Sequence, residues 1–478
     1  MSSNDFQTAI LTKEQNECVN FNAGDLLVRG VAGSGKSYVI LKRAVKLYKG
    51  KKSNESVAIF TYTNSLVKYT DDLISEKLGE DQVEVLTVDS YCMSVYYRIT
   101  GRKFFISSPS MYAELVKNTI EDHQKMTKLN HRFYDMNQIF FEEEFKWIRE
   151  KCIKKKEEYL DADRRGRGSQ VRLNTKDKEI LWNIYMLFIA KAKQKKFSDW
   201  PGLYMALNDN LHRIPEDKKI DYILLDEAQD MTVGQMKVMK ALSKQSLTIA
   251  ADIAQKIYKK SFTWKEVGID ISGRSSKSLS KSFRSTKQIV KLAEDLMSIN
   301  RKNNKGEYTE AVLPEAEGNK PRLVRCSTVD SEKSYVAKLM KTYLEDMNAT
   351  IGVIVRTDDD VCSMKHLLYN AGISEYQVVD KKKEWSLLTP GIKIVKAHSS
   401  KGLEFDYVII PSVNDSVYPF RTYRVDDEQI EEYLTIERNI LYVAMTRARK
   451  TLVMTCQALS ASRFISEFKK EHYEDESL

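Results

Sequence analysis

One short loop constrains the fold of this chain more than any other feature. It reads G-x-x-x-x-G-K-S from Gly30 to Ser37, follows the apolar run 26–29, and leads into the helical pattern 38–47. A strand, a Gly-rich turn and a helix in this order indicate a P-loop, because the backbone N–H groups of the turn can surround phosphate oxygens and the helix N-terminus adds a positive dipole. We predict that Lys36 reaches the β- and γ-phosphates of ATP and that Ser37 holds Mg²⁺. The predicted ATP-binding residues of this loop are Gly30, Gly33, Ser34, Gly35, Lys36 and Ser37.

A second apolar run, residues 222–225, ends directly in the adjacent carboxylates Asp226 and Glu227. Nucleotide hydrolysis needs one carboxylate to complete the Mg²⁺ shell and a base to polarise the attacking water, so we assign these roles to Asp226 and Glu227 respectively. Two carboxylates at a strand end also occur as solvated turn residues. The P-loop upstream favours the catalytic interpretation.

Short apolar runs alternate with turns and helical patterns along most of the chain, which is typical of an α/β fold with parallel sheets covered by helices. Residues 94–215 break this alternation with charged and aromatic helical stretches, including 140–156, and predict a helical insertion. We predict a first sheet domain over residues 1–93 and 216–277, a second over 278–468, and an acidic tail over 469–478. The predicted strands are 26–29, 57–61, 222–225, 247–251, 350–355, 392–396 and 407–410.

Three polar segments are predicted to be connections rather than sites. Residues 272–280, which contain Ser-Gly-Arg-Ser-Ser-Lys-Ser, are typical of a linker between the two sheet domains. Residues 302–320 are polar and rich in turn formers, and the acidic tail from Glu471 is expected to fray, as chain ends commonly do.

The composition excludes several classes of protein. The 478 residues are 42% hydrophobic and 30% charged, which is the balance of a folded chain rather than a disordered one. Six scattered cysteines without Cys-x-x-Cys spacing suggest neither a disulfide framework nor a zinc site. The amino terminus lacks a basic region followed by an apolar stretch, so we expect a cytoplasmic protein with no membrane partner. The formal net charge of +9 favours a polyanionic partner without identifying one.

The five residues Asp-Glu-Ala-Gln-Asp at 226–230 resemble the second motif of the UvrD/Rep-type superfamily 1 helicases, and the resemblance extends over both sheet domains. It implies two tandem RecA-like motor domains with a helical insertion in the first, and ATP and Mg²⁺ as cofactors. Residues 11–15 are similar to the family's amino-terminal glutamine motif, which implies that Gln15 reads the adenine edge. Residues 251–258 are similar to G-D-x-x-Q-S-I-Y, which implies that Gln255 senses the γ-phosphate.

Residues 59–64 and 86–90 look like the family's strand-contacting motifs. Stacking of bases on aromatic side chains is the expected design for a single-stranded track, and Tyr62, Tyr258 and Trp264 are the predicted stacking residues. Each of these aromatics is alternatively a buried residue of an α/β core. The DNA-binding residues that the resemblance and this design imply are Tyr62, Thr63, Asn64, Thr87, Ser90, Tyr258, Trp264 and His398.

In the second domain, residues 279–286 resemble the motif whose aromatic stacks on adenine and whose arginine touches the γ-phosphate, which implies these roles for Phe283 and Arg284. Residues 397–405 and 437–448 look like the last two motifs, so that Glu404 would bind ribose and Arg447 would be a second arginine finger. ATP contacted by both arginines favours a closed state, and hydrolysis releases it. The implied catalytic set is Lys36, Asp226, Glu227, Gln255, Arg284 and Arg447.

The chain is shorter than typical members of that family. Residues 375–390 lead straight to the motif around His398, where typical members insert a large helical regulatory subdomain. This compact layout makes strong duplex unwinding doubtful and leaves translocation intact. It resembles the helicase partner of the nuclease in Gabija-type anti-phage systems, and also small repair helicases. The basic residues within 154–168 are either a solvated face or a phosphate contact at a duplex junction.

Two functions are consistent with these motifs. The first is an ATP-dependent translocase or helicase on single-stranded DNA or at its junction with duplex, with 3′→5′ polarity implied by the resemblance, in DNA repair or anti-phage defence. The alternative is a DNA-sensing regulatory ATPase subunit that licenses a partner nuclease. A decayed motor is disfavoured by the intact catalytic set. The residues do not decide between DNA and RNA as the bound strand, because no sequence feature is recognisable as a contact for a 2′-hydroxyl group.

Overall fold

The computed structural model describes residues 10–61, 64–79, 82–162, 173–252, 264–269, 273–303, 311–379, 389–420 and 430–478. The chain divides into two units. The first comprises Met1–Leu27, Ser37–Ala250 and Lys259–Lys277, and the second comprises Val28–Lys36, Ala251–Tyr258 and Ser278–Leu478. Most of the P-loop is therefore grouped with the carboxyl-terminal half of the chain.

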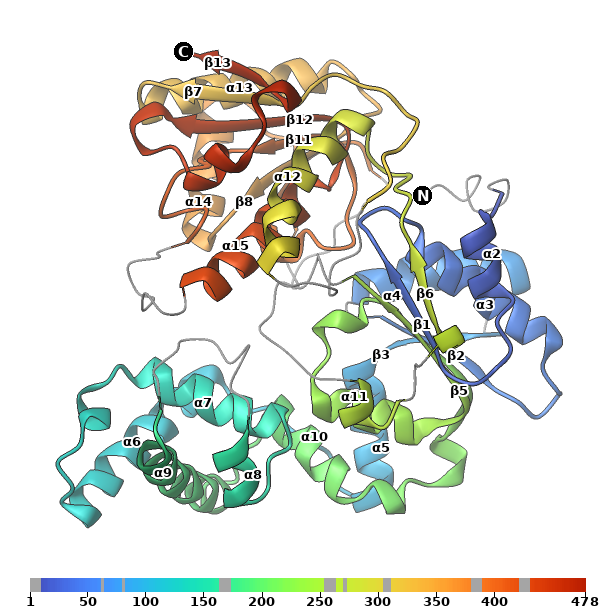
Figure 1. Cartoon of the computed structure of the whole chain (residues 1–478), viewed down its shortest axis with the longest axis vertical. Coiled ribbons are helices and arrows are strands. Elements are labelled where there is room, and N and C mark those ends of the chain that lie inside the picture. The colour runs from blue at the N-terminus through green and yellow to red at the C-terminus, as the bar shows by residue number, and fades with distance from the viewer. Residues whose placement is uncertain are drawn as a thin grey trace. The chain divides into compact units, whose positions relative to one another are not determined.

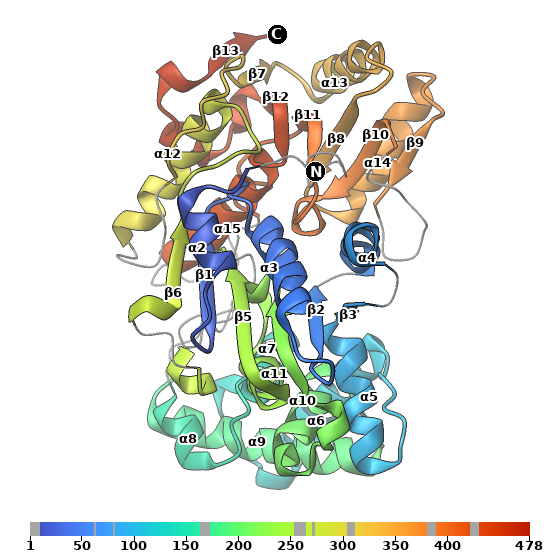
Figure 2. The ribbon, with the colours of Figure 1, turned by 90° about the vertical axis from the view of Figure 1, so that its right-hand side faces the viewer.

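The first sheet has six strands in the order β3-β2-β4-β5-β1-β6 (Figure 2). The pairings of β2 with β3 and β4, and of β4 with β5, are parallel. The segments that follow these four strands therefore lie along one edge of the sheet, where ligands of open α/β sheets bind. The strands are β1 (Leu26–Gly30), β2 (Val57–Thr61), β3 (Glu84–Thr87), β4 (Ile220–Leu225), β5 (Ser243–Ala251) and β6 (Ser276–Leu279).

Helices α3 and α4 pack on one face of this sheet, where Ile40, Ile74 and Ile59 belong to one buried cluster that joins α3, α4 and β2. Burial of the apolar faces of these helices supplies most of their stability, because isolated helices of this length are marginal in water. The helices that accompany the sheet are α2 (Lys13–Val19), α3 (Lys36–Gly50), α4 (Asn64–Leu78), α5 (Val88–Thr100) and α11 (Val233–Leu242).

The chain between β3 and β4 carries the helical insertion, whose helices α6 to α9 gather around a core of their own (Figure 1). Phe133, Phe141, Phe145, Tyr159 and Phe188 are fully buried in that core. Aromatic side chains bury large areas, so this cluster gives the insertion a hydrophobic core separate from those of the sheets. The helices of the insertion are α6 (Pro109–Thr127), α7 (Gln138–Glu150), α8 (Lys156–Asp161), α9 (Thr175–Gln194) and α10 (Trp200–Asp209).

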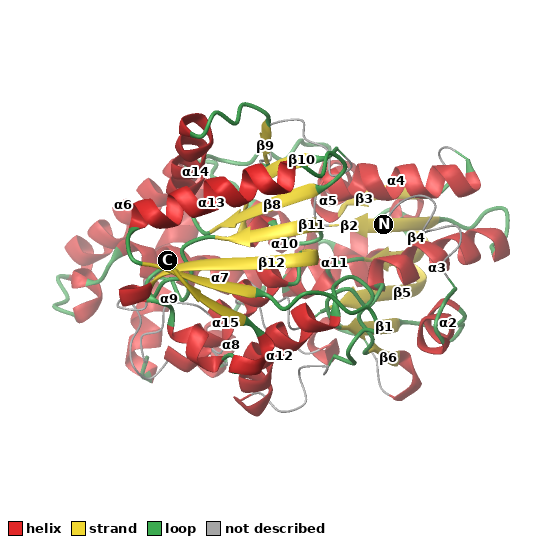
Figure 3. Ribbon diagram, turned by 90° about the horizontal axis from the view of Figure 1, so that it is seen from above, coloured by secondary structure: helices red, strands yellow, loops and turns green. Residues whose placement is uncertain are grey.

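The second sheet has seven strands in the order β13-β7-β12-β11-β8-β10-β9, and all of its pairings are parallel. Strand β8 alternates its side chains between two cores, because Ile351 and Val353 pack with α13 and α14 while Ile354 packs with α12 and α15. Figure 3 shows these helix pairs on opposite faces of the sheet. The elements are β7 (Arg322–Cys326), β8 (Thr350–Val355), β9 (Tyr376–Val378), β10 (Gly391–Lys396), β11 (Phe405–Ile410), β12 (Ala448–Gln457), β13 (Glu474–Ser477), α12 (Lys287–Asn303), α13 (Val329–Leu344), α14 (Asp358–Asn370) and α15 (Ile430–Met445).

The predicted fold class is confirmed: the chain has two parallel-sheet α/β domains, and each of the seven predicted strands falls within β1, β2, β4, β5, β8, β10 or β11. The expected linker 272–280 contains the boundary between the two units, which falls between Lys277 and Ser278, and it also contains β6, the edge strand of the first sheet. The expectation of a frayed tail is wrong. The expected frayed tail contains β13, which pairs with β7, because Glu476 and Asp475 form ion pairs with Arg322 and Arg325 of that strand.

The helix expected over 140–156 is interrupted. Helix α7 ends at Glu150 and α8 begins at Lys156. Between them Cys152 has a φ of 55°, a left-handed conformation that an α-helix does not admit. The break lets the chain turn back, so that α7 and α8 both reach the core of the insertion.

Gly352 of β8 faces the fully buried ring of Phe405, and a Cβ atom added at Gly352 would lie 2.4 Å from that ring. We expect Gly352→Ala to lower the free energy of unfolding by about 1–3 kcal/mol, because overpacking a filled core forces its neighbours to shift. Urea-induced unfolding measures the loss. Gly50→Ala, at an exposed helix end with no atom within 4 Å of the added carbon, is the control and should be neutral. Equal unfolding curves for the two variants would contradict the packing argument.

No helix within the described ranges is long and apolar enough to cross a membrane. The six cysteines are free thiols. The same ranges hold no group of three or more His, Cys, Asp or Glu side chains that is placed to bind a metal ion.

Candidate functional site

The P-loop connects β1 to α3 through a turn that only glycine fits at two points. Gly33 and Gly35 have φ values of 72° and 81°, in the left-handed region that side chains disfavour. A Cβ atom at Gly30 would lie 2.4 Å from Ser34 Oγ. The three glycines therefore allow a tight turn, and Ser37 is exposed in the first turn of α3. This is the geometry that the sequence motif predicts.

Lys36 is buried and held by the loop itself. Its Nζ donates to the carbonyl oxygens of Gly30 and Val31, each at 2.9 Å, and forms an ion pair with Asp252 Oδ2 at 3.1 Å. Asp252 follows β5, the neighbour of β1 in the sheet, and is itself buried. We did not assign Asp252 a role from the sequence. Its position directly after a buried strand, like that of Asp226, is the signal that could have identified it.

We expect Lys36→Met to weaken ATP binding roughly 10- to 100-fold, because hydrogen bonds from a charged donor contribute about 1.5–3 kcal/mol. Titration with a fluorescent ATP analogue measures the affinity. Lys49→Met, at the exposed end of α3, is the matched control and should bind like the wild type. Because the ion pair with Asp252 is also lost, thermal unfolding should be measured alongside, and a well-folded Lys36→Met with undiminished affinity would refute the assignment.

Asp226 and Glu227 lie directly after β4, as predicted. The Asp226 N–H donates to the carbonyl of Phe60 at 2.9 Å, which ties the turn to β2. Glu227 adopts a φ of 55° and a ψ of 33°, and its Oε2 accepts a hydrogen bond from Gln229 Nε2 at 2.6 Å. A left-handed backbone at a residue other than glycine costs free energy, and such strain concentrates at functional sites. The turn thus holds the Glu227 side chain in one orientation.

Arg284 and Phe283 lie against the P-loop within the second unit. The Phe283 N–H donates to the Gly33 carbonyl at 2.8 Å, and a Cβ atom at Gly33 would lie 2.6 Å from Arg284 Cβ. Arg284 Nε donates to Glu404 Oε1 at 2.7 Å, while its buried Nη1 has no hydrogen-bond partner among the residues that the structure describes. A buried guanidinium nitrogen without a partner is costly and suits an anionic ligand. The residues at this loop therefore fit a phosphate group.

Glu404 is charged. Burial by itself would raise the pKa of this carboxyl, but the Arg284 guanidinium and the nearby Arg447 hold it at about 2. The resemblance implies that Glu404 binds ribose, whereas in the structure it orients Arg284. Phe283 is 51% exposed, and the ammonium of Lys281 lies 5.6 Å from its ring centroid. Its exposed face fits the predicted stacking role.

The side chains of Arg447 and Gln15 form hydrogen bonds with nearby backbone atoms. Arg447 is fully buried and donates to the carbonyl oxygens of Val443 and Leu403 at 2.9 and 3.3 Å. Gln15 is buried in α2, where its Oε1 accepts from the Thr12 N–H as part of a capping box. Their predicted roles toward ATP stay predictions.

The predicted strand-contacting residues are only partly described. Tyr62, Thr63, Gln255 and Tyr258 lie outside the described residues. Asn64 begins α4, and Trp264 is half-buried at the start of a short 3-10 helix.

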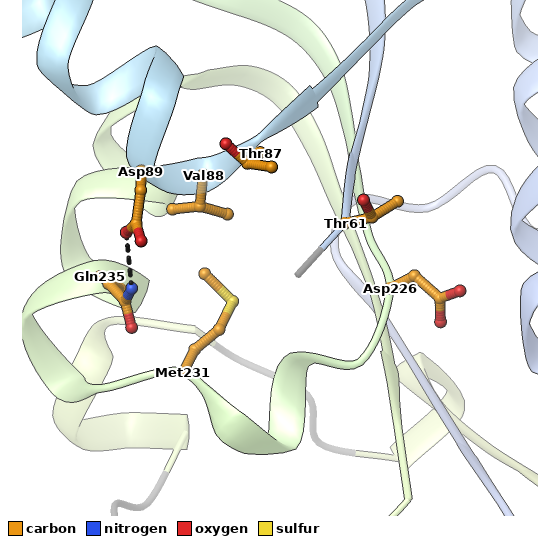
Figure 4. A pocket seen from close by; sticks show the side chains of 7 residues that line it. All are labelled: Thr61, Thr87, Val88, Asp89, Asp226, Met231 and Gln235. Carbon is orange, nitrogen blue, oxygen red and sulfur yellow. Dashed lines mark hydrogen bonds between the residues drawn. The ribbon is translucent and has the colours of Figure 1, made fainter. Parts of the chain in front are cut away.

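Thr87 and Ser90 form the amino-terminal cap of α5, in which Thr87 Oγ1 accepts from the Ser90 N–H at 3.2 Å. Asp89 accepts from Tyr204 of α10 and from Gln235 Nε2 of α11 at 3.2 Å, so it links the insertion to the sheet domain. A pocket beside this cap brings Thr87 together with Asp226 (Figure 4). Its lining residues are Thr61, Thr87, Val88, Asp89, Asp226, Met231 and Gln235.

His398 is a half-buried member of a polar cluster of the second unit, in which Arg356 and Glu437 are buried. Arg356 Nη1 donates to His398 Nδ1 at 2.8 Å, and Arg356 Nη2 donates to Glu437 Oε1 at 2.7 Å. A guanidinium can only donate, so the His398 ring accepts at Nδ1 and is neutral. Burial, with Arg356 and Lys396 close by, lowers the pKa of His398 to about 4. Sequence reasoning missed Arg356 and Glu437.

We expect this histidine to make the unfolding free energy depend on pH. The folded pKa lies below the ordinary value, so the stabilisation is complete above pH 6.5 and is lost as the pH falls toward 4, by on the order of 2 kcal/mol. Urea midpoints between pH 7.5 and 4.5 measure the slope. His398→Gln should flatten it, and equal slopes for the two proteins would contradict the assigned protonation state.

Two family models match the sequence. The UvrD/REP helicase N-terminal domain matches residues 11–266, and the UvrD-like helicase C-terminal domain matches residues 379–458. The first match covers more than half of the chain, and it includes the P-loop and the carboxylates after β4.

Several curated proteins are similar to the chain. A probable DNA helicase II homolog of Mycoplasma capricolum is 25% identical over 333 residues, which cover 65% of this chain and 43% of that protein. The ATP-dependent DNA helicase PcrA of Staphylococcus epidermidis is 24% identical over 352 residues, which cover 69% and 45%. The chain thus spans less than half the length of these relatives. A crystal structure of the C-terminal domain of a possible DNA helicase from Lactobacillus plantarum matches 41% of the chain and 98% of its own, at 22% identity and a TM-score of 0.29, a similarity too weak to bear on the fold.

Proposed function

The chain belongs to the UvrD/Rep family of superfamily 1 helicases, and from this premise we propose that it is an ATP-dependent translocase on single-stranded DNA. Movement is 3′→5′, as the family resemblance implies, and unwinding is limited. The proposed catalytic residues are Lys36, Asp226, Glu227, Gln255, Arg284 and Arg447.

One observation carries the proposal. Arg284 and Gly33 are in contact, and the buried Nη1 of Arg284 has no hydrogen-bond partner within the described part of the chain. A positive group placed at a P-loop can stabilise charge that develops on the γ-phosphoryl oxygens, which supplies much of the catalysis in phosphoryl transfer. The same contact makes the segment around Arg284 sensitive to whether a γ-phosphate is bound. A ligand that interacts differently with two states shifts the equilibrium between them.

Mg²⁺ would be held by Ser37 and Asp226, whose hydroxyl and carboxylate oxygens are the ligands this ion prefers. The ion would neutralise charge on the phosphates. Glu227 would accept the proton of the attacking water through its carboxylate, which Gln229 orients.

The short connection between β9 and β10 supports limited unwinding. Strand β9 ends at Val378 and its parallel neighbour β10 begins at Gly391, so this position offers no room for a large subdomain. A motor that unwinds little DNA by itself is suited to act together with a partner protein. The second candidate function is therefore a DNA-sensing ATPase subunit that licenses a nuclease. Repair and anti-phage defence are the proposed settings, and the cytoplasm is the proposed location.

Steady-state ATP hydrolysis tests the proposal, with no nucleic acid, single-stranded DNA of several lengths, duplex DNA, and single-stranded RNA as activators. A translocase should respond to single-stranded DNA, with stimulation that depends on length. Displacement of streptavidin from the 5′ end, faster than from the 3′ end, would agree with 3′→5′ movement. If ATP binds but no nucleic acid stimulates hydrolysis, the translocase is refuted and the subunit that waits for a partner is favoured.

A further inference from the structure

Two connectors of the helical insertion run side by side. The first joins α5 to α6 over residues 101–108, and the second joins α9 to α10 over residues 195–199. The Ser107 N–H donates to the Ser198 carbonyl at 2.8 Å, and the Ser198 N–H donates back to Ser107 Oγ at 3.1 Å. Ser198 Oγ also donates to the Phe105 carbonyl. These three hydrogen bonds make the connectors one surface.

Each connector turns one aromatic ring inward. Phe104 packs edge-on against Tyr96, with ring centroids 5.0 Å apart. Phe197 stacks on Tyr112 with centroids 5.7 Å apart and rings 20° from parallel. Aromatic pairs of this geometry are stabilising, so both connectors are anchored to the insertion.

The aromatic residues next to these anchors are exposed. Phe105 is 72% exposed, and Trp200, the first residue of α10, is 38% exposed. The position of Trp200 is fixed by Asp199, which caps α10 and forms an ion pair with the buried Arg149, whose Nη1 lies 2.7 Å from both carboxylate oxygens. Exposed aromatic side chains held by a rigid support are typical of binding surfaces rather than of free loops.

The connector that holds Phe105 and the one that precedes Trp200 also carry cations. Arg102, Lys103 and Lys196 are exposed, and no ion pair to any of them is found in the described part of the chain. Lys196 has a φ of 52°, and the Phe197 N–H donates to the Ala192 carbonyl at 2.8 Å, as in the Schellman motif, where glycine is the usual residue. A lysine therefore occupies a position at which glycine would cost less. Asp199, the acidic residue of the second connector, is paired with Arg149, and Glu114 of α6 lies 3.9 Å from Lys195.

We infer that Arg102, Lys103, Phe105, Lys196 and Trp200 form a second contact for single-stranded DNA, separate from the strand-contacting motifs of the sheet domains. We call this set the insertion platform. Bases stack on exposed aromatic rings and phosphates pair with exposed cations, and this combination tolerates any sequence. The platform rests on the proposed function only in the choice of DNA as the strand, and its test is a binding measurement that does not need ATP hydrolysis.

The chemistry favours a nucleic acid strand over a protein partner. A protein interface of useful size needs a largely apolar centre from which charged residues are depleted. Here two exposed aromatic residues and three cations, for which the described part of the chain shows no ion pair, lie on or directly after the two connectors. A polyanion with flat bases matches both features.

The test is equilibrium binding of fluorescent oligo(dT) of increasing length to the whole chain without nucleotide, over a range of salt concentrations. Phe105→Ala should weaken binding of long oligonucleotides by roughly five- to 100-fold, the range found for loss of one base stack. Trp200→Ala should act in the same direction. Tyr369→Ala, a residue 84% exposed in α14, is the matched control and should leave binding unchanged.

Lys196→Gly separates binding from folding. Glycine suits the left-handed backbone there, so the thermal midpoint should stay the same or rise. The plot of log Kd against log salt should lose about 0.7 of its slope, the value for one phosphate contact on a single strand. Lys128→Gly, at the carboxyl end of α6 with the same φ of 52°, is the control and should keep the wild-type slope.

The outcomes distinguish this inference from the proposed function. Loss of binding in the platform variants supports the platform even if ATP hydrolysis proves insensitive to DNA. Wild-type affinity at every length for Phe105→Ala and Trp200→Ala refutes it while leaving the motor untouched. If the variants lost affinity for oligo(U) to the same extent, the platform would be a contact for RNA as well as for DNA. Self-association that Trp200→Ala abolishes, with DNA binding unchanged, would refute the platform in favour of a contact between copies of the chain.

Discussion

Replacing Arg284 with alanine is expected to slow ATP hydrolysis by about 10³- to 10⁵-fold while ATP binding changes far less. Arginines that reach the transferred phosphoryl group contribute this much in other enzymes, because they act on charge that grows in the transition state. Arg284 suits the role, since Glu404 holds its Nε and no described residue accepts a hydrogen bond from its Nη1. Single-turnover hydrolysis and a separate nucleotide titration measure the two effects.

Arg284→Lys and Glu404→Gln are the companion variants. Lysine keeps the charge but not the forked geometry, so it should recover only part of the rate. Glu404→Gln removes the charged partner that orients Arg284 and should give an intermediate loss. If Arg284→Ala weakened ATP binding as much as it slowed turnover, Arg284 would stabilise bound ATP rather than the transition state. It would then not be an arginine finger.

Replacing Glu227 with glutamine is expected to slow hydrolysis by about 10²- to 10⁴-fold at unchanged ATP affinity. The amide keeps the shape of the side chain but cannot accept a proton, and general-base catalysis contributes a factor of this size. Because Glu227 already has the left-handed backbone, the substitution adds no new strain. Rapid-quench measurement of phosphate release gives the rate.

Glu216→Gln is the matched control, because this exposed carboxylate of the same unit makes only surface ion pairs. It should hydrolyse ATP like the wild type. A Glu227→Gln protein that hydrolyses ATP at the wild-type rate would assign the base to another group.

The P-loop, the strand before it and the carboxylates after β4 were predictable because each is a contiguous signal. A run of apolar residues followed by a Gly-rich turn has one good local structure, and Gly33 and Gly35 take the left-handed conformations that this turn requires. The acidic pair Asp226 and Glu227 follows its strand without an intervening residue. Local patterns of this kind do not depend on partners elsewhere in the chain.

The edge strands were not predictable in this way. Strand β13 consists of Glu, Asp, Glu and Ser, a composition with low strand propensity. It forms because Arg322 and Arg325, about 150 residues earlier in the chain, present charge to Glu476 and Asp475. Strand β6 likewise forms in a segment that is typical of a linker.

The sequence by itself determined the family, the two α/β domains and the position of the P-loop that is predicted to bind ATP, because these follow from motifs and periodicity within short stretches of chain. The tertiary structure alone decided that Lys36 pairs with Asp252, that Glu404 holds Arg284, and that the connector holding Phe105 is hydrogen-bonded to the connector that precedes Trp200. Those contacts join residues far apart in the chain. These contacts stabilise the protein only after folding has brought the residues together at a cost in chain entropy. No pattern within a short stretch of sequence therefore predicts them.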